Sequence, residues 1–293
     1  MITFPNSKIN IGLNVIEKRS DGYHNIESVF YPVNLQDALE INLLRRPIDV
    51  KLIKLDKDRV RKRSVETDQY AINLLGSIIP GHPSENLVVK AYLRLLKDFD
   101  IPPIDIHLYK HIPSGAGLGG GSSDGAHMIS LLNRRFGLRM TLSKMEEYAS
   151  ELGADCPFFI RNRPVLATGI GNIMDPIELS LKSWSLLIVK PNIDITTKES
   201  YANITPNKLN MPLIDAIKEP IENWKDIIVN DFEKEAFLKY PELKKIKEKI
   251  YSIGAVYASM TGSGSAIYGL FQKPIEHPRE LFPGLFCRQR ELM

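Results

Sequence analysis

The sequence predicts a protein of two domains, each built from both helices and strands. The chain has 293 residues, which is long enough for two domains that each have a core. Stretches in which apolar and polar residues alternate predict strands, and capped stretches with helical spacing predict helices. Residues 161–164 (R-N-R-P) lie between two groups of such elements. We therefore expect domains at residues 1–162 and 163–293.

The chain begins with a predicted pair of strands. In residues 7–18 four apolar residues alternate with Lys8, Asn10 and two small or polar residues, which predicts a strand with one apolar and one polar face. Lys8 and Asn10 are two residues apart and therefore lie side by side on the polar face. Residues 19–22 (R-S-D-G) predict a turn, and residues 23–33 can return as a second strand. In this hairpin the start of the second strand lies near Lys8 and Asn10.

The remaining elements follow from the same two patterns. The Ser-Glu-Asn run before Leu87 and the Gly after Leu152 are typical helix boundaries, and Thr141 or Ser143 can open the helix that ends at Leu152. In residues 104–108 Ile104, Ile106 and Leu108 alternate with polar residues, which predicts a half-exposed strand. Strands are also expected at residues 35–44, 184–190, 255–260 and 266–271, and helices at residues 87–97, 125–136, 141–152, 223–240 and 241–252.

Composition excludes several classes of protein. A net charge of +3, from 38 basic and 35 acidic residues, favours no polyanionic partner. The two cysteines form neither a C-x-x-C motif nor a cluster with histidines, which argues against a disulfide framework and a zinc site. The first residues lack the pattern of a signal peptide, and no apolar run approaches the roughly 18 residues of a membrane span. We expect a cytoplasmic protein with no membrane and no nucleic-acid partner.

One charged segment leaves a second function open. Residues 54–63 (K-L-D-K-D-R-V-R-K-R) are basic enough for a nucleic-acid contact. Two acidic residues interrupt the run and no aromatic residue lies within it, so a solvated loop or hairpin is the favoured interpretation.

The most informative segment is rich in glycine. Residues 113–123 read P-S-G-A-G-L-G-G-G-S-S, and Asp124 follows. Glycine lets the main chain bring its N–H groups close to a ligand. Ser122, Ser123 and Asp124 are candidate N-caps for the helix expected from Gly125, so the loop leads into a helix N-terminus, where an anion binds favourably. The alternative is a glycine-rich turn that binds nothing.

Two common glycine-loop sites do not fit this segment. Its G-x-G-x-x-G spacing also occurs in dinucleotide-binding folds, but there the preceding strand is buried on both faces and an acidic residue ends a second strand about 20 residues later. Here the preceding strand alternates, and the later residues are helical in pattern. A Walker A loop requires a lysine after the glycines, and none follows. A lysine-free phosphate loop, with main-chain N–H groups and serine hydroxyls as donors, remains.

These residues resemble the GHMP kinases, the family of galactokinase, homoserine kinase and mevalonate kinase. The loop followed by S-S-D is closest to a member that acts on a cytidine diphosphate-linked alcohol. Five further segments fit in order along nearly the whole chain: P-N-S-K-I-N-I-G-L at 5–13, R-S-D-G-Y-H at 19–24, E-N-L-V at 85–88, L-G-A-D-C-P-F-F at 152–159 and T-G-S-G-S at 261–265. Residues 49–79 depart from the family pattern, because they are longer and more basic.

The resemblance implies an α+β fold of two domains with the active site between them. The N-terminal domain would be like domain 2 of ribosomal protein S5, and the C-terminal domain would be ferredoxin-like. The implied reaction transfers the γ-phosphoryl group of ATP, accompanied by Mg²⁺, to the 2-hydroxyl of a methylerythritol unit in the non-mevalonate isoprenoid precursor pathway. The implied residues are Lys8 and Asp155 for catalysis, Asn10, Tyr23, His24 and Tyr201 for the substrate, and, for ATP, Pro113, Ser114, Gly115, Ala116, Gly117, Leu118, Gly119, Gly120, Gly121, Ser122 and Ser123.

Each of these residues also has an ordinary structural interpretation. An aspartate before a proline, as at Asp155, usually caps a turn, and a lysine on a strand is usually solvated. Tyr23 and His24 can be ordinary hairpin residues. For the whole chain, the alternatives are a GHMP kinase acting on another small alcohol, such as homoserine or mevalonate, and a nucleotide-binding regulator without catalysis.

Overall fold

The computed structural model describes residues 1–44, 63–202, 204–206 and 211–292, so residues 54–62 of the basic run lie outside the described residues. Two compact units make up the chain. Unit 1 comprises residues 1–7, 35–114 and 119–162, and unit 2 comprises residues 8–34, 115–118 and 163–293. The second unit therefore includes the first hairpin and four residues of the glycine loop. Among the described helices, none is both long and apolar enough to cross a membrane.

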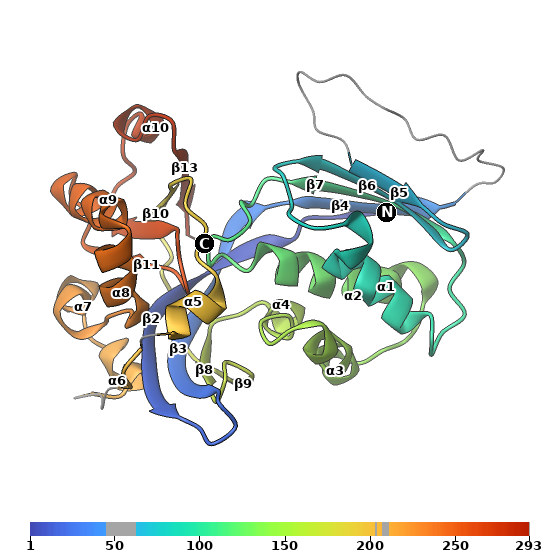
Figure 1. The fold of residues 1–293 in the computed structure, drawn as a ribbon, viewed down its shortest axis with the longest axis horizontal. Coiled ribbons are helices and arrows are strands. Elements are labelled where there is room, and N and C mark those ends of the chain that lie inside the picture. The colour runs from blue at the N-terminus through green and yellow to red at the C-terminus, as the bar shows by residue number, and fades with distance from the viewer. Residues whose placement is uncertain (45–62, 203, 207–210, 293) are drawn as a thin grey trace. The chain divides into compact units, whose positions relative to one another are not determined.

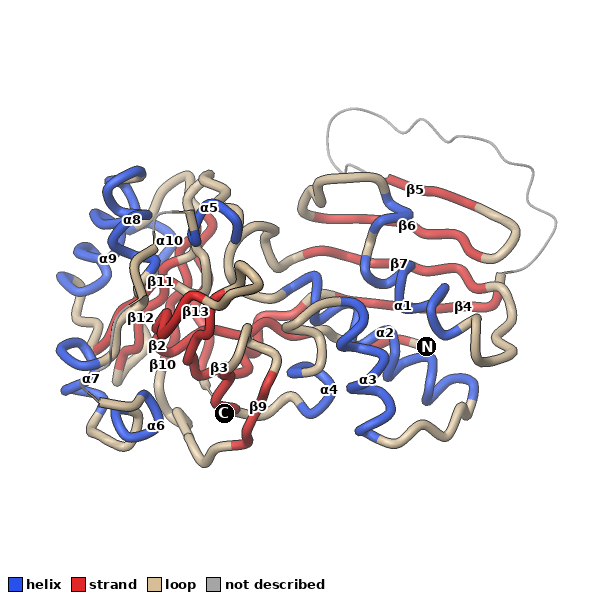
Figure 2. Tube along the Cα trace, turned by 60° about the horizontal axis from the view of Figure 1, so that its bottom comes forward, coloured by secondary structure: helices blue, strands red, loops and turns tan. Residues whose placement is uncertain are grey.

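Unit 1 is a five-stranded sheet with helices on one face (Figures 1 and 2). Its strands, in spatial order, are β1 (Ile2–Thr3), β4 (Ala38–Leu43), β7 (Ile104–Lys110), β6 (Tyr70–Gly76) and β5 (Arg63–Glu66). Only β6 and β7 pair in parallel. The helical elements are η1 (Pro83–Glu85), α1 (Leu87–Leu95), α2 (Gly120–Phe136), α3 (Leu142–Leu152) and α4 (Phe158–Arg161).

The core of unit 1 follows the predicted strand and helix patterns. Ile104, Ile106 and Leu108 of β7 are fully buried against the helices, while Asp105 and His107 between them are partly exposed. Asn86 accepts a hydrogen bond from the N–H of Val88 at the start of α1, and Thr141 caps α3, so both predicted helix starts are confirmed.

The predicted start of the helix after the glycine loop is wrong. Helix α2 begins at Gly120, five residues before the expected Gly125, and its N-cap is Gly119 in the left-handed conformation. Ser122, Ser123 and Asp124 therefore lie in the first turns of α2 and do not cap it. The physical reason is that a glycine can enter the left-handed region at no steric cost, so the backbone can turn into the helix before any side-chain cap is reached.

Unit 2 contains two four-stranded sheets. One has the order β2 (Asn6–Lys18), β3 (His24–Gln36), β8 (Val165–Thr168) and β9 (Ile173–Pro176). The other is antiparallel throughout and has the order β11 (Tyr257–Met260), β12 (Ile267–Phe271), β10 (Ser185–Lys190) and β13 (Phe286–Glu291). Its helices are α5 (Thr197–Tyr201), α6 (Leu213–Ala216), α7 (Ile221–Ile227), α8 (Phe232–Lys239), α9 (Pro241–Ser252) and α10 (Pro278–Leu281).

The helix predicted over residues 223–240 is two helices, α7 and α8, separated at residues 228–231. The main chain of this break pairs with β2: the N–H of Leu13 donates to the carbonyl of Val229 (2.9 Å), and the N–H of Asp231 donates to the carbonyl of Leu13 (2.8 Å). The side-chain amide of Asn230 donates to the carbonyls of Met260 (2.8 Å) and Gly262 (2.9 Å). Leu13 therefore satisfies main-chain groups of Val229 and Asp231, in the middle of the segment where the sequence pattern predicts a continuous helix.

Strand β2 differs from its prediction in one respect. Ten consecutive residues, 6–15, are buried, so the polar face that carries Lys8 and Asn10 is covered as well as the apolar face. The partners that cover this face come from residues distant in the sequence.

Candidate active site

The glycine loop connects β7 to α2 in a conformation that only glycine adopts without strain. Gly115, Gly117 and Gly119 all have positive φ angles of 60°, 71° and 68°. A Cβ atom on Gly117 would lie 1.9 Å from the carbonyl oxygen of Thr261, which belongs to the main chain. The alternation of glycine with Ala116 and Leu118, which are buried, therefore fixes both the path of the loop and its close contact with residue 261.

The loop is held by the second glycine turn, T-G-S-G-S at residues 261–265. The hydroxyl of Thr261 donates to the carbonyl of Gly117 (3.0 Å), and the N–H of Ala266 donates to the carbonyl of Ala116 (3.3 Å). All of these residues belong to unit 2. The T-G-S-G-S motif thus has a clear structural task, which is to hold residues 115–118 of the loop.

The start of α2 presents main-chain donors. The N–H of Ser123 is the first in the helix to find an acceptor four residues back, at the carbonyl of Gly119 (2.9 Å). The N–H groups of the preceding helical residues have no such acceptor within the helix, and Gly119 offers no side-chain cap. With the positive end of the helix dipole at the same place, this turn suits an anion such as a phosphate group.

Lys8 and Asn10 form a buried polar pair beside the loop. The side chain of Lys8 is 3% exposed and that of Asn10 is 2% exposed. Lys8 Nζ donates to Asn10 Oδ1 and lies 4.5 Å from the centre of the Phe30 ring. The main-chain N–H of Lys8 donates to the carbonyl of Leu118 (3.0 Å), so the strand that carries Lys8 is tied directly to the glycine loop.

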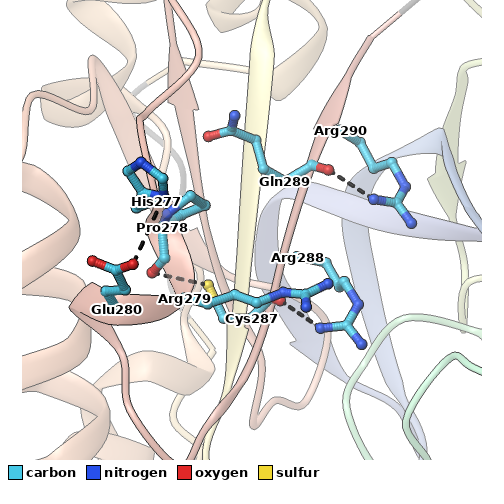
Figure 3. A pocket seen from close by; sticks show the side chains of 8 residues that line it. All are labelled: His277, Pro278, Arg279, Glu280, Cys287, Arg288, Gln289 and Arg290. Carbon is cyan, nitrogen blue, oxygen red and sulfur yellow. Dashed lines mark hydrogen bonds and ion pairs between the residues drawn. The ribbon is translucent and has the colours of Figure 1, made fainter.

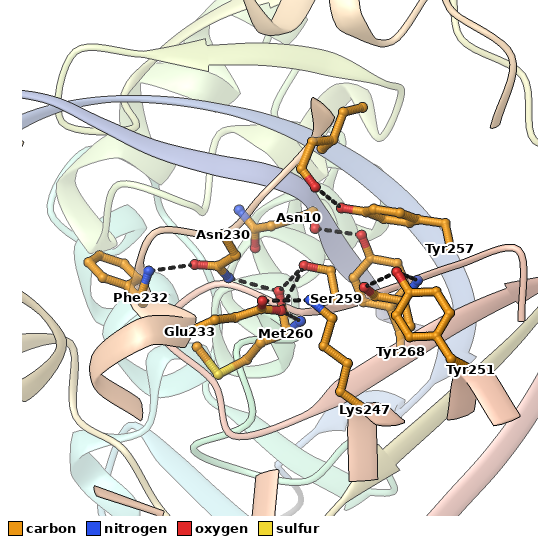
Figure 4. A network of polar contacts seen from close by, with 12 residues as sticks. Asn10, Asn230, Phe232, Glu233, Lys247, Tyr251, Tyr257, Ser259, Met260 and Tyr268 are labelled. Atoms are coloured by element: carbon orange, nitrogen blue, oxygen red, sulfur yellow. Dashed lines mark hydrogen bonds and ion pairs between the residues drawn. The ribbon is translucent and has the colours of Figure 1, made fainter. Parts of the chain in front are cut away.

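Asn10 is fixed from several directions, and Figure 4 shows part of this network. Its side-chain amide donates to Ser28 Oγ (2.8 Å), and its main-chain N–H donates to Thr261 Oγ1 (3.0 Å). The hydroxyl of Tyr268 donates to its carbonyl (2.9 Å). Because Thr261 also binds the carbonyl of Gly117, one threonine connects Asn10 to the loop.

Further residues of the network in Figure 4 support the turn that carries Thr261. The carboxylate of Glu233 accepts from the N–H of Met260 (2.7 Å), from Ser259 Oγ (3.2 Å) and from Lys247 Nζ (2.6 Å). Glu233 lies in α8. Asn230 lies just before α8, and its side chain donates to the carbonyls of Met260 and Gly262, the residues on either side of Thr261. The position of Thr261 is therefore supported by Asn230, in the break between α7 and α8, and by Glu233 of α8.

His24 and Tyr201, two predicted substrate residues, lie together in unit 2. Their rings stack with centroids 4.9 Å apart and planes 17° from parallel, and the Tyr201 ring meets Phe232 edge-on, also at 4.9 Å. Burial, helped by the charge of Lys18, lowers the pKa of His24, which favours the neutral ring. Tyr23 is 61% exposed and does not share this stack in the described contacts. Two rings in contact leave no space for a third between them, so a flat ligand would stack on an outer face.

Asp155 lies in unit 1, in the turn between α3 and α4, and is partly buried. The N-cap of α4 is Pro157, so Asp155 is not the cap of that helix. The next residue, Cys156, is buried, and its pKa is raised to about 11 by burial, with the charge of Asp155 acting in the same direction. Lys8 belongs to unit 2, so the pairing of Lys8 with Asp155 stays a prediction.

A buried charge cluster that no sequence motif predicted lies at the entrance of the loop. Lys110, the last residue of β7, donates through Nζ to a carboxylate oxygen of Asp37 and to Asp124 Oδ2 (2.6 Å). The three side chains are 4%, 0% and 1% exposed. The other oxygen of Asp37 accepts from the N–H groups of His111 and Ile112. The cluster therefore ties the end of β7 to the first turns of α2.

Protonation decides the charge of this cluster. Burial raises the pKa of Asp124 to about 8, the Asp37 carboxylate acts in the same direction, and Lys110 opposes both. Among the described residues, Asp124 Oδ1 is buried without a hydrogen-bond partner. With a proton on Asp124, the cluster holds one ammonium, one carboxylate and one neutral acid, which is the arrangement that leaves least uncompensated charge in a buried site.

Comparison with known proteins agrees with this geometry. The model of the GHMP kinases N-terminal domain matches residues 86–163, and the model of the GHMP kinases C-terminal domain matches residues 212–279. A relative from Bacteroides fragilis named 4-diphosphocytidyl-2-C-methyl-D-erythritol kinase is 49% identical over 292 residues, covering 100% of both chains. A protein of the same name from Bacteroides thetaiotaomicron is 52% identical over 273 residues, covering 93% of this chain and 92% of the other.

The chain belongs to the GHMP kinase family. This GHMP kinase is also similar to a crystal structure of 4-(cytidine 5'-diphospho)-2C-methyl-D-erythritol kinase, with a TM-score of 0.76 and 27% identity over 99% of this chain and 98% of that one. A mevalonate kinase structure shares the fold, with a TM-score of 0.68 at 14% identity over 100% and 99% of the two chains. The predicted family and α+β fold are thus confirmed.

Proposed function

We propose that this GHMP kinase phosphorylates the 2-hydroxyl of 4-diphosphocytidyl-2-C-methyl-D-erythritol with ATP, in the non-mevalonate pathway to isoprenoid precursors. The carrying observation is the hydrogen bond from the N–H of Lys8 to the carbonyl of Leu118, which ties the proposed catalytic lysine to the phosphate loop. The two relatives described above, which match 100% and 93% of the chain, bear the name of this kinase, which favours its substrate over homoserine or mevalonate.

The glycine loop binds the phosphates of ATP in this proposal. The N–H groups of Gly120, Gly121 and Ser122 at the start of α2 and the hydroxyl of Ser122 are the donors. The predicted role of Ser123 does not extend to its hydroxyl, because this side chain is buried and its oxygen lies 3.2 Å from His127 Nδ1. Donors that are already oriented stabilise the charge that moves on the γ-phosphoryl group during transfer. The remaining loop residues, Pro113, Ser114, Gly115, Ala116, Gly117, Leu118 and Gly119, shape the site.

The transfer forms one bond and breaks one. The substrate oxygen attacks the γ-phosphorus in line with the bond to the β–γ bridging oxygen, which breaks as ADP leaves. Asp155 accepts the hydroxyl proton. Lys8, already held by Asn10 and by the face of Phe30, hydrogen-bonds the attacking oxygen.

Magnesium accompanies the nucleotide and neutralises its phosphates. Among the described residues, no group of three or more His, Cys, Asp and Glu could hold a metal ion. A magnesium ion that is bound mostly by phosphate and water oxygens needs no such group. We further propose a cytoplasmic location, because Cys156 and Cys287 are buried free thiols, which suit a reducing compartment.

Asn10, Tyr23, His24 and Tyr201 bind the cytidine-bearing substrate in this proposal. A neutral His24 ring stacked on Tyr201 gives a flat apolar surface on which a cytosine can lie. The test of the substrate compares turnover of 4-diphosphocytidyl-2-C-methyl-D-erythritol, homoserine and mevalonate. Absence of turnover with the first would refute the assignment.

The test of the mechanism is Asp155→Asn. It should lower kcat by about 10²- to 10⁴-fold, the usual contribution of a general base, and leave ATP affinity largely unchanged. Asp100→Asn, at an exposed aspartate of the same unit, is the matched control and should retain full activity. If Asp155→Asn turns over at the wild-type rate, Asp155 is not the base.

A further inference from the structure

Lys190 is a buried lysine in unit 2 that the proposed site does not use. It is the last residue of β10, the strand between β12 and β13, and is 8% exposed. Its Nζ donates to the carbonyls of Pro191 (3.2 Å) and Ile193 (3.2 Å) and to Asp194 Oδ1 (3.0 Å). An ammonium group has three N–H donors, so these three acceptors use all of them. Lys190 thus holds both the main chain of residues 191–193 and the carboxylate of Asp194.

The segment that Lys190 holds lies against the glycine loop. A Cβ atom on Gly115 would lie 2.9 Å from Asp194 Oδ1 and 3.3 Å from its carboxyl carbon, so the carboxylate packs directly on this glycine. The carbonyl of Ile193 accepts from Ser265 Oγ, and the N–H of Ser265 donates to the carbonyl of Gly115 (3.4 Å). All of these residues belong to unit 2.

A carboxylate is an unfavourable neighbour for a loop that binds phosphate groups. The side chain of Asp194 is 74% exposed, and like charges repel. From Gly115 to Gly120, where α2 begins, the chain spans at most about 18 Å even when it is fully extended. At an ionic strength of 0.01 M the screening length is about 30 Å, so the charge of Asp194 acts on an anion anywhere along the loop.

Among the described residues, Lys190 is the cation that forms an ion pair with Asp194. Strand β13, which pairs with β10, lines a pocket of about 360 Å³ in unit 2 (Figure 3), and its lining residues, 277–280 and 287–290, include neither member of the pair. The contacts of the pair point instead to Gly115, and any effect of its charges is therefore expected at the glycine loop.

We propose that Lys190 is a positioning residue for ATP, which acts through Asp194: its ammonium group cancels the negative charge that lies against Gly115 and so raises the affinity of the loop for phosphate groups. This rests on the proposed function in one respect, which is that the glycine loop binds ATP. An ion pair with one exposed partner adds little to stability. Its effect is expected in the affinity for the nucleotide.

The test measures binding of a non-hydrolysable ATP analogue with Mg²⁺ to the full chain, by isothermal titration calorimetry at low ionic strength. Lys190→Met should bind the analogue about 5-fold more weakly, because the unpaired carboxylate acts on several phosphate charges at once. Asp194→Asn should bind it about 2- to 5-fold more tightly, because the ammonium group then has no carboxylate beside it. The two changes together should restore the wild-type affinity to within about twofold.

This pattern separates charge from structure. If Lys190 only held residues 191–193 in place, the double variant would bind as weakly as Lys190→Met does, and Asp194→Asn would bring no gain. Raising the ionic strength to about 1 M, where the screening length is about 3 Å, should reduce the difference between Lys190→Met and the wild type. The matched control is Lys218→Met, which breaks the exposed pair of Lys218 and Asp215 (2.8 Å) in the same unit and should bind as the wild type does.

The proposal is overturned if Asp194→Asn binds the analogue more weakly than the wild type, or if the double variant stays as weak as Lys190→Met. If the wild type binds the analogue and all variants bind it equally, the role of Lys190 is refuted while the ATP site stands. If the wild type does not bind the analogue at all, the ATP site of the proposed function is refuted as well.

Discussion

Replacement of Lys110 by methionine tests the buried cluster that anchors the glycine loop. Methionine is similar in length and fills the space of the lysine stem, so the main change is the loss of the ammonium group. The carboxylate of Asp37, which is 0% exposed, then has no cation beside it. Breaking a buried ion pair by removing one partner usually costs about 3–5 kcal/mol.

The structure places the expected value at the lower end of this range. Asp37 retains two donors, the N–H groups of His111 and Ile112, after the lysine is lost. Asp124, with a pKa of about 8, already holds its proton at neutral pH and adds little uncompensated charge. We therefore expect a loss of about 3 kcal/mol in the stability of unit 1.

The assay is amide hydrogen exchange measured by mass spectrometry on separate peptides, because two units need not unfold together. A loss of about 3 kcal/mol should speed exchange in the most protected amides of β7 and α2 by about 100-fold, with β10 and β12 of unit 2 as internal references. Adding Asp37→Asn to Lys110→Met should restore part of the protection, because the neutral amide removes the buried charge.

Lys90→Met, at an exposed position on α1, is the matched control and should change stability by less than about 0.5 kcal/mol. The reasoning fails if Lys110→Met leaves protection of β7 and α2 within about fivefold of the wild type. It fails equally if the peptides of unit 2 lose as much protection as those of unit 1.

Two further predictions concern the loop. In the folded chain burial raises the pKa of Asp124 to about 8, whereas in the unfolded chain the carboxyl has its usual pKa of 3.8. This carboxyl therefore makes the free energy of unfolding fall as the pH rises from about 4 to about 8. Asp124→Asn should make that fall smaller, as measured by urea unfolding at several pH values. Gly117→Ala should lower the melting temperature and raise KM for ATP, since its Cβ meets the carbonyl of Thr261 at 1.9 Å. Gly121→Ala, a helical position with nothing within 4 Å, should not lower the melting temperature; an equal loss in both variants would contradict the steric argument.

Local patterns in the sequence are sufficient where neighbours along the chain decide the structure. The caps at Asn86 and Thr141 and the alternation in β7 depend on residues a few positions apart, and all three predictions are confirmed. The density of glycine before α2 predicted a loop that leads into a helix, but the predicted helix start was wrong because Gly119 can enter the left-handed region where other residues cannot. The binding of an anion by this loop stays a prediction.

The same patterns also hold a signal for the buried charge cluster of Asp37, Lys110 and Asp124. Asp37 has the same alternation phase as Leu35 and Leu39, and Lys110 continues the phase of Ile106 and Leu108, so each charge stands where an apolar residue is expected. A charge in a buried position requires a partner. The sequence could have predicted that both residues are paired, but not that they pair with each other and with Asp124.

What the sequence by itself determined is the family, the glycine loop and the residue types available for phosphoryl transfer. Only the tertiary structure decided that Lys8 and Asn10 are buried, that Thr261 joins Asn10 to Gly117, and that the helical pattern stops at Asn230. The physical reason is the same in each case. A polar group is buried only where a partner satisfies it, and these partners lie far away along the chain, where no local spacing records them.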